Sequence, residues 1–300
     1  MSAIVTEPGV RWDMPEDNYH ADPVAKGSLS HSMAKLIAQP GGPAKLRWQL
    51  DHPKPYRKVF DFGHAAHALV LGTGPELWPI PEDHLASNGA TSTTKAKDFI
   101  AQARSAGAVP LKPAEYQQVK DMALALARDD DAVEVVAATD ARHEVSAFTV
   151  DPITGLFLRC RFDTIAPHSM GDYKTAVDAN PDHFDRVALR HGYHQQAAWY
   201  SDTATDLGLT DPDAPFRFVA QEKEPPYLVG VVTLDADFIQ IGRDANRAAI
   251  DLYAHCLATN TWPGYQPKTI SAPPWAYPAQ TRLDPAIEAE LIALMTGDAA

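Results

Sequence analysis

Residues 155–176, GLFLRCRFDTIAPHSMGDYKTA, decide the fold expected for this chain, because they have the pattern of two successive strands joined by a short turn. Successive side chains of a strand point to opposite faces, so the first strand has one apolar face and one that carries charge. The apolar face would meet a core, and the other would end in a carboxylate. The apolar set is Leu156, Leu158, Cys160 and Phe162, and the opposite set is Phe157, Arg159, Arg161 and Asp163.

The second strand brings another carboxylate and an amine to the same place. Asp172 and Lys174 are two residues apart and share a face, so Asp163 can converge with them if the strands are neighbours. Two carboxylates repel each other unless a cation lies between them, and Mg²⁺ suits such oxygen ligands. Lys174 would then assist an attacking water or stabilise charge on a phosphoryl oxygen. The alternative is an ordinary surface Asp–Lys pair, which contributes little.

A helix predicted over residues 182–207 has polar and aromatic side chains on one face. Gln196 and Tyr200 are four residues apart, and Tyr193 precedes Tyr200 by seven. Beside a metal site this face suits contacts to a phosphate, a sugar or a base. The alternative is a helix surface with one half-buried tyrosine.

His64 and His67 share a face of an apolar helix predicted over residues 60–72. A buried histidine is often structural and needs only one satisfied hydrogen bond, so the pattern leaves both roles open. The sequence lacks the HExxH pair of zinc hydrolases, so zinc hydrolysis is not favoured.

The whole-chain composition limits the class of protein. Its 300 residues fit one large domain or two small ones, and no apolar run approaches the roughly 20 residues of a transmembrane helix. A net charge of −13 argues against a protein that coats nucleic acid, but it leaves room for a local basic channel. Two cysteines exclude a disulfide framework, and with no secretion signal we expect a cytoplasmic protein.

The order of elements predicts a mixed α/β domain with a helical N-terminal portion packed on it. We expect an extended arm over 1–27, a single domain over 28–272 with its catalytic core at about 143–260, and a tail over 273–300. The patterns predict helices over 28–40, 44–52, 60–72, 95–107, 113–128, 182–207, after Asp235 and near 284–296; strands over 143–152, 155–167, 170–176 and two within 216–234; a loop over 73–94; and a solvated turn at 129–131.

Four motifs follow one another in this chain: a glycine four residues before His67, then Asp163, then the DxK of residues 172–174, then the QxxxY of 196–200. Together they resemble the PD-(D/E)xK nuclease superfamily, and especially its exodeoxyribonuclease VIII (RecE-type) branch, related to RecB-type and lambda-type exonucleases. The resemblance implies a restriction-endonuclease-like core, a mixed central sheet flanked by helices. The stretches that carry it are SLSHSMAKLIAQPGGPAKLRW, FDFGHAAHALVLG, RCRFDTI with GDYKTA, YHQQAAWY, and EKEPPY, spread over residues 28–227.

The resemblance also implies a role for each matching residue. Lys174 would be the catalytic lysine, acting with His67 and the two aspartates. Glu144, on a neighbouring strand, would be an outer-shell group. The implied metal ligands are His67, Asp163, Asp172 and the main-chain carbonyl of Tyr173; the expected DNA contacts are Gln196 and Tyr200, with Tyr193, Arg159 and Arg161 beside them.

Three departures from the branch are visible. Asp172 stands where glutamate is the alternative, and residues 73–97 match no motif. The large non-nuclease N-terminal region of full-length exodeoxyribonuclease VIII is absent, so the chain resembles a compact phage or prophage form, which would act in the host cytoplasm.

The expected activity is that of a Mg²⁺-dependent exodeoxyribonuclease, with Mn²⁺ as a substitute. By resemblance it would resect duplex DNA ends from 5′ to 3′ and leave 3′ single strands for recombination. A single-strand annealing recombinase is the expected partner, and a ring-shaped homo-oligomer the expected assembly. Two alternatives stay open: a structure-selective or single-strand endonuclease of the same fold, and an idle protein that only binds DNA or a recombinase.

Overall fold

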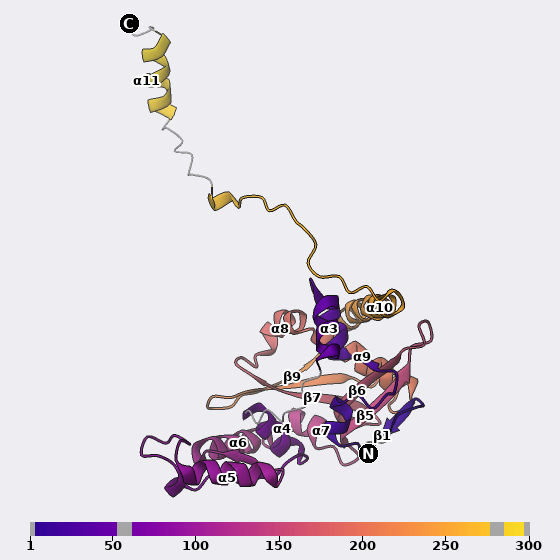
Figure 1. Cartoon of the computed structure of the whole chain (residues 1–300). Coiled ribbons are helices and arrows are strands. Elements are labelled where there is room, and N and C mark those ends of the chain that lie inside the picture. Colours follow the sequence, from indigo (N-terminus) through magenta and orange to yellow (C-terminus); the bar gives the residue numbers. More distant parts are fainter. Residues whose placement is uncertain (1–3, 53–61, 277–284, 297–300) are drawn as a thin grey trace. The chain divides into compact units, whose positions relative to one another are not determined.

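The computed structural model describes residues 4–52, 62–276 and 285–296. These residues fall into two units, which divide between Gly264 and Tyr265. The first unit holds the sheet described below, and the second holds helix α11 (Pro285–Thr296) (Figure 1). None of the described helices is both long and apolar enough to cross a membrane.

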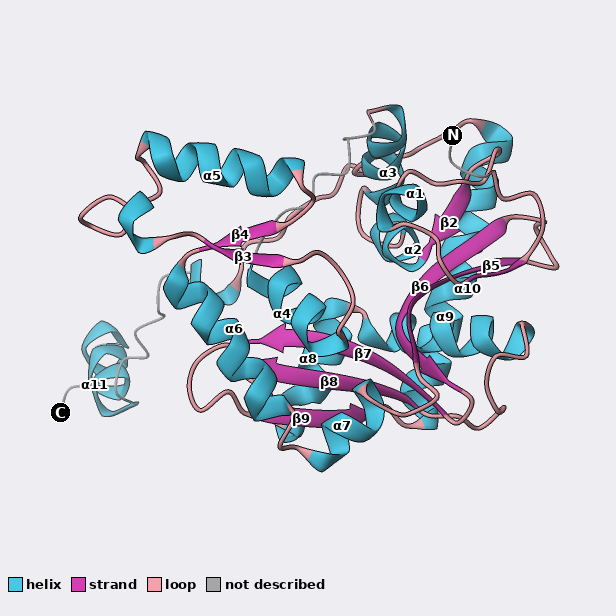
Figure 2. Ribbon diagram, turned by 90° about the horizontal axis from the view of Figure 1, so that it is seen from below, coloured by secondary structure: helices cyan, strands magenta, loops and turns pink. Residues whose placement is uncertain are grey.

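Within the described residues, a seven-stranded mixed sheet forms the centre of the first unit (Figure 2). The order of neighbours is β1-β5-β6-β7-β8-β9, and β2 pairs separately with β6. The β2–β6 and β7–β8 pairs are parallel, and the other pairs are antiparallel. The predicted mixed α/β class is confirmed. The strands are β1 (Gly9–Arg11), β2 (Ser28–Ser30), β5 (Arg142–Val150), β6 (Phe157–Ala166), β7 (Ser169–Ala176), β8 (Phe216–Glu222) and β9 (Val229–Thr233), and a separate parallel pair joins β3 (Leu77–Pro79) to β4 (Val109–Leu111).

Two strands share one edge of β6, and this splits the sheet. Residues 164–166 of β6 pair with β7, whereas residues 157–159 pair with β2. Between these two ladders, residues 160–162 pair with β5 alone among the described strands. Asp163 stands where β6 and β7 separate, and we call this place the fork.

Helices cover both faces of the sheet and give it two cores (Figure 1). Helices α2, α3, α8, α9 and α10 pack on one face, whereas α4, α6 and α7 pack on the other. Because side chains alternate along β8, Phe218 enters the first core and Val219 the second. The bounds are α1 (Glu16–His20), α2 (His31–Ile37), α3 (Gly42–Asp51), α4 (Phe62–Leu71), α5 (Thr94–Ser105), α6 (Pro113–Leu126), α7 (Asp130–Val136), α8 (Phe184–His191), α9 (Tyr193–Asp206) and α10 (Ala236–Thr259).

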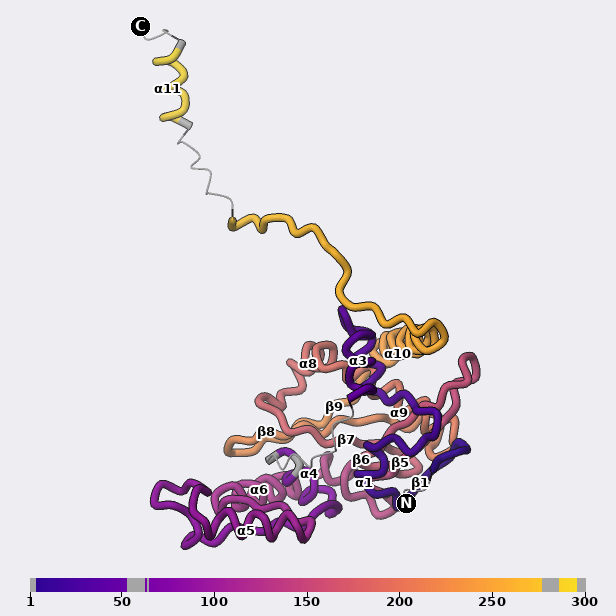
Figure 3. The backbone as a smooth tube through the Cα atoms, in the orientation of Figure 1, coloured from indigo at the N-terminus to yellow at the C-terminus, as the bar shows by residue number. Residues whose placement is uncertain are grey.

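The N-terminal segment is folded against the sheet, where the sequence predicts an extended arm. Its strand β1 pairs with β5, so the chain follows the sheet edge (Figure 3). Val5, Tyr19 and Val24 are buried with Phe148 in a small core of their own. Apolar residues scattered among prolines gave no periodic signal, yet they bury enough surface to hold the segment in place.

Several local predictions differ from the structure for identifiable reasons. The aspartates at 129–131 do not form a solvated turn: the Asp129 side chain accepts a hydrogen bond from the N–H of Ala132 and caps α7. The helix predicted over 182–207 is divided by Gly192, whose φ of 70° ends α8. Residues 73–94 contain β3 and a 3-10 turn rather than loop alone. Residues 60, 61 and 284, where two predicted helices begin, lie outside the described part of the chain.

Close packing of α9 on α10 gives a test of how the site is positioned. A Cβ added to Gly242 of α10 would lie 2.1 Å from the carbonyl oxygen of His194 on α9. We predict that Gly242→Ala lowers the free energy of unfolding by about 1–3 kcal/mol, measured by urea denaturation. Ala248→Ser, on the exposed side of the same helix, should have little effect. Equal stability of Gly242→Ala and the wild type would contradict this packing.

Candidate active site

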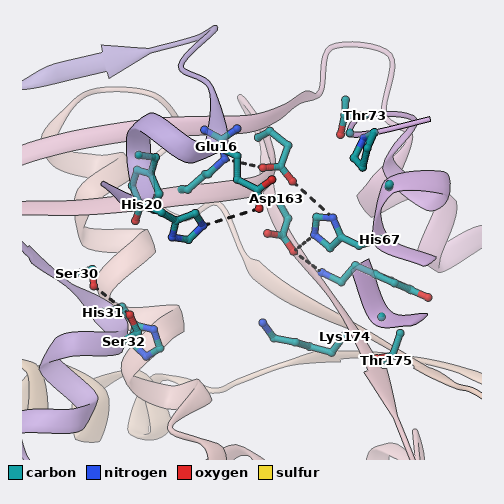
Figure 4. A pocket seen from close by; sticks show the side chains of 18 of the residues that line it. Glu16, His20, Ser30, His31, Ser32, His67, Thr73, Asp163, Lys174 and Thr175 are labelled. Carbon is teal, nitrogen blue, oxygen red and sulfur yellow. Dashed lines mark hydrogen bonds and ion pairs between the residues drawn. The ribbon is translucent and has the colours of Figure 1, made fainter. Parts of the chain in front are cut away.

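A cavity of about 690 Å³ opens beside the fork. Its walls come from segments far apart in the sequence, including α1, α2, α4, β5, β6, β7 and α9 (Figure 4). His67, Glu144, Asp163 and Lys174 face into it. The helical N-terminal portion and the sheet therefore form the site together.

Three side chains in the cavity are spaced as ligands of one cation. His67 of α4 reaches across to β6, where its Nε2 is 3.0 Å from Asp163 Oδ2. Its Nδ1 is 3.5 Å from Glu144 Oε1 on β5. One donor atom from each of the three residues lies within 4.8 Å of the others. An imidazole with two carboxylates is a donor set that suits a divalent cation.

The backbone at Glu144 has a conformation that aims this side chain. Its φ is 55°, in the left-handed region that a residue with a Cβ adopts at a cost of about 1–3 kcal/mol. The register of β5 and β6 pairs the neighbours of Glu144 with the neighbours of Asp163, so these two residues lie at the same level, where the ladder is interrupted. The resemblance predicts that Glu144 lies outside the set of direct metal ligands, whereas the structure groups its carboxylate with His67 and Asp163.

The Asp163 carboxylate makes polar contacts at the fork. Its Oδ2 accepts a hydrogen bond of 3.0 Å from the backbone N–H of Tyr173. The N–H and C=O of one strand residue point to the same side, so the Tyr173 carbonyl faces the fork as well, as its predicted ligand role requires. Burial alone would raise the pKa of Asp163, but His67, Lys174 and the Tyr173 N–H outweigh it and hold the pKa below its usual value.

Asp172 and Lys174 form a second group, in which the Asp172 side chain is 3% exposed and the Lys174 side chain 28%. Lys174 Nζ is 2.5 Å from Asp172 Oδ2, and Gln196 Nε2 of α9 donates to Asp172 Oδ1 at 2.5 Å. Burial and the neighbouring Asp163 raise the pKa of Asp172 to about 6. Burial would lower the pKa of Lys174, but Asp172 and Asp163 outweigh it and raise the pKa, so Lys174 is a cation. Asp172 and Lys174 therefore lie together, as their shared strand face predicts, whereas Gln196, for which a DNA contact is predicted, is buried with its amide on Asp172.

Arg159 and Arg161, the two arginines predicted to contact DNA, both form ion pairs within the chain. Arg159 is 7% exposed and its Nη1 contacts Asp22 Oδ2 at 2.6 Å and the Ser28 hydroxyl at 2.5 Å. It is not among the residues that line the cavity, so the structure places it away from the site, and its DNA contact stays a prediction. Arg161 lines the cavity, but its Nε is committed to Glu144 Oε2 at 2.6 Å.

The predicted aromatic contacts lie at the base of the site. Tyr200 lines the cavity with its ring packed edge-on against Phe162. Tyr193 stacks on Phe218, and Lys174 Nζ lies 5.4 Å from the centre of the Tyr193 ring. Both rings therefore support the site from the core side, and the Tyr193 ring orients the lysine.

The N-terminal residues build one wall of the cavity, which the sequence pattern does not predict. Glu16 and His20 on α1 and His31 on α2 line the cavity. Burial, and then the charge of Lys174, lower the pKa of His31 to about 3, so its ring is neutral. The one sequence feature that could have indicated this wall is the i, i+4 spacing of Glu16 and His20, but their helix is too short to show a periodic pattern.

The split sheet with two aspartates and a lysine at the fork defines a PD-(D/E)xK nuclease-like protein. Residues 30–269 match the family described as "PDDEXK-like domain of unknown function (DUF3799)", and the chain belongs to that family. Among solved structures it is similar to a "putative exonuclease" from Eubacterium rectale, with a TM-score of 0.53 and 14% identity over 86% of this chain and 96% of that one. At this identity the likeness shows the fold alone. A comparison with curated proteins finds no match. Fold and family together support a hydrolytic nuclease.

The contacts of His67 make cation binding depend on pH. Burial alone would lower its pKa, but Asp163, Glu144 and Asp172 outweigh it and raise the pKa to about 9, so His67 is protonated at neutral pH. A cation that uses this imidazole must displace the proton. We predict that the association constant for Mg²⁺ rises roughly tenfold per pH unit from about pH 6.5 to 8.5 and levels off above about pH 9.

Isothermal titration calorimetry in buffers of different ionisation enthalpy should record about one proton released per cation at pH 7.5. His67→Asn should remove this pH dependence, whereas Lys97→Ala, on an exposed face of α5, should keep it. An affinity that does not vary with pH would contradict a His67 that is protonated without the metal and binds it as a ligand.

Proposed function

We propose that this chain is a metal-dependent deoxyribonuclease that hydrolyses phosphodiester bonds at the fork. The observation that carries the proposal is the grouping of His67, Glu144 and Asp163 around one point, with Lys174 on the adjacent strand. When bound, a divalent cation, Mg²⁺ or Mn²⁺, supplies Lewis-acid polarisation of the scissile phosphate. His67, Asp163, Glu144 and the Tyr173 carbonyl are the groups we propose to hold it, with Asp172 next to them.

Lys174 is the proposed catalytic cation. Its ammonium lies between Asp172 and the Tyr193 ring, which limits its movement and keeps it charged. From this place it donates hydrogen bonds to an attacking water and stabilises negative charge that builds on a phosphoryl oxygen. Gln196 holds the other oxygen of Asp172, so the carboxylate and the ammonium stay aligned. Arg161 and Tyr200 shape the wall beside the substrate.

The finer activity that we propose is resection of duplex DNA ends from 5′ to 3′, leaving 3′ single strands for recombination. The order and spacing of the GxxxH, D, DxK and QxxxY motifs support it, and so does the name exonuclease given to the structural neighbour. A single-strand annealing recombinase as partner and a phage or prophage source rest on the same resemblance. The proposed nuclease domain is residues 28–272.

Labelled linear duplex DNA, with a closed circle alongside, tests the reaction. We predict early release of a 5′ label in Mg²⁺, no cutting of the circle, and no activity in EDTA. Lys174→Ala should lower the rate by at least about 100-fold, because it removes a charge aimed at the reacting phosphate. Lys97→Ala should cleave like the wild type.

Other outcomes of this experiment separate the alternatives. A cut circle would favour the endonuclease, because an exonuclease needs an end. DNA binding without Mg²⁺-dependent cleavage on any substrate would contradict hydrolysis and favour the protein that only binds.

The proposed assembly has its own test. A net charge of −13 fits a ring whose outer surface repels DNA while a central channel admits it. We predict a homo-oligomer in gel filtration with light scattering. A stable monomer at micromolar concentration would contradict the ring and leave the proposed chemistry untouched.

A further inference from the structure

The carboxylate of Glu144 is shared between the cavity and one arginine. Its Oε1 faces His67 at 3.5 Å, and its Oε2 accepts a hydrogen bond of 2.6 Å from Arg161 Nε. The two oxygens thus have different partners on opposite sides. A carboxylate held in this way presents one fixed oxygen to the cavity.

Arg161 is itself held by groups other than Glu144. Its Nη1 donates to the Ser146 hydroxyl at 2.6 Å and to the Met14 carbonyl at 3.0 Å. The guanidinium carbon lies 5.9 Å from the centre of the Tyr19 ring. Met14 and Tyr19 belong to the N-terminal segment, so the position of Arg161 depends on how that segment packs.

We propose that Arg161 is a positioning residue that fixes Glu144 as a ligand of the metal centre, and that the N-terminal segment acts on the centre through it. The inference rests on the proposed function, because it assumes that a divalent cation binds at His67, Glu144 and Asp163. Glu144 makes its contacts with His67 and Arg161 from a backbone whose φ is 55°.

The charge of Arg161 and its positioning of Glu144 predict opposite changes in cation affinity when Arg161 is lost, so the two roles can be distinguished. A positive charge next to a cation site repels the cation, so loss of the charge alone would tighten binding. Loss of the planar guanidinium lets the Glu144 side chain adopt other rotamers, which weakens cation binding. Arg161→Lys keeps the charge and loses the planar guanidinium, so it isolates the positioning effect.

Arg159 provides a matched control two residues earlier on the same face of β6. Its side chain is 8% exposed, against 13% for Arg161. It is also ion-paired, to Asp22, and its guanidinium also lies over Tyr19, at 5.6 Å. It contacts the same N-terminal segment but has no hydrogen bond to Glu144. Arg159→Lys therefore reproduces the packing disturbance without the link to the site.

The experiment measures Mg²⁺ and Mn²⁺ affinity by calorimetry on the full chain, with thermal unfolding of every variant recorded without metal. Arg161→Lys should weaken binding by about tenfold, in the range seen when groups that orient metal ligands are changed. Arg159→Lys should stay within about twofold of the wild type. Glu144→Gln should weaken binding, and adding Arg161→Lys to it should cause no further loss, because the arginine acts through Glu144.

Several results would overturn the proposal. If Arg161→Lys binds the cation as tightly as the wild type, the planar guanidinium does not position Glu144. An equal loss in Arg159→Lys would reduce the effect to packing of the N-terminal segment. If Arg161→Lys does not fold, Ser146→Ala removes one anchor of Arg161 with a smaller change, and unaltered affinity in that variant would also overturn the proposal. Metal binding that survives Asp163→Asn would instead contradict the proposed metal centre itself.

Discussion

Three carboxylates, Glu144, Asp163 and Asp172, gather where β6 and β7 separate, and the rest of the site depends on compensating their charge. In a half-buried place like charges repel strongly, so each carboxylate needs a positively charged partner: two of these partners come from another element, and one comes from the same strand. Glu144 has Arg161, Asp172 has Lys174 and Asp163 has His67. The elements that carry these partners must therefore pack correctly before the site exists.

The split in the sheet supplies the space for this arrangement. Because β2 takes one half of the β6 edge and β7 takes the other, a stretch of backbone between them is left without a strand on that side. The Asp163 carboxylate satisfies the free N–H of Tyr173, and the cavity occupies the remaining volume. A continuous ladder would have closed the space and turned the same side chains into ordinary sheet residues.

The sequence predicts the part of the site that depends on local period. Alternation along two strands identified Asp163, Asp172 and Lys174, and helical spacing identified Gln196. It could not place Arg159, because its partner Ser28 is 131 residues away and nothing local distinguishes a buried ion pair from a DNA contact. The sequence did not place Glu144 in the metal group for another reason. Its backbone is left-handed, a conformation that a glycine in the sequence would suggest but a glutamate does not. The N-terminal wall was missed because its elements are too short to show a period.

The local charges also bear on how so acidic a chain meets DNA. Without a metal at neutral pH, the protonated His67, Lys174 and Arg161 balance the carboxylates of Glu144, Asp163 and Asp172, and Glu16 adds a further carboxylate on the cavity wall. A divalent cation that displaces the His67 proton adds one net positive charge at this centre. On the proposed reaction, the phosphate is therefore attracted only where a metal is bound, and the negative outer surface discourages contacts elsewhere.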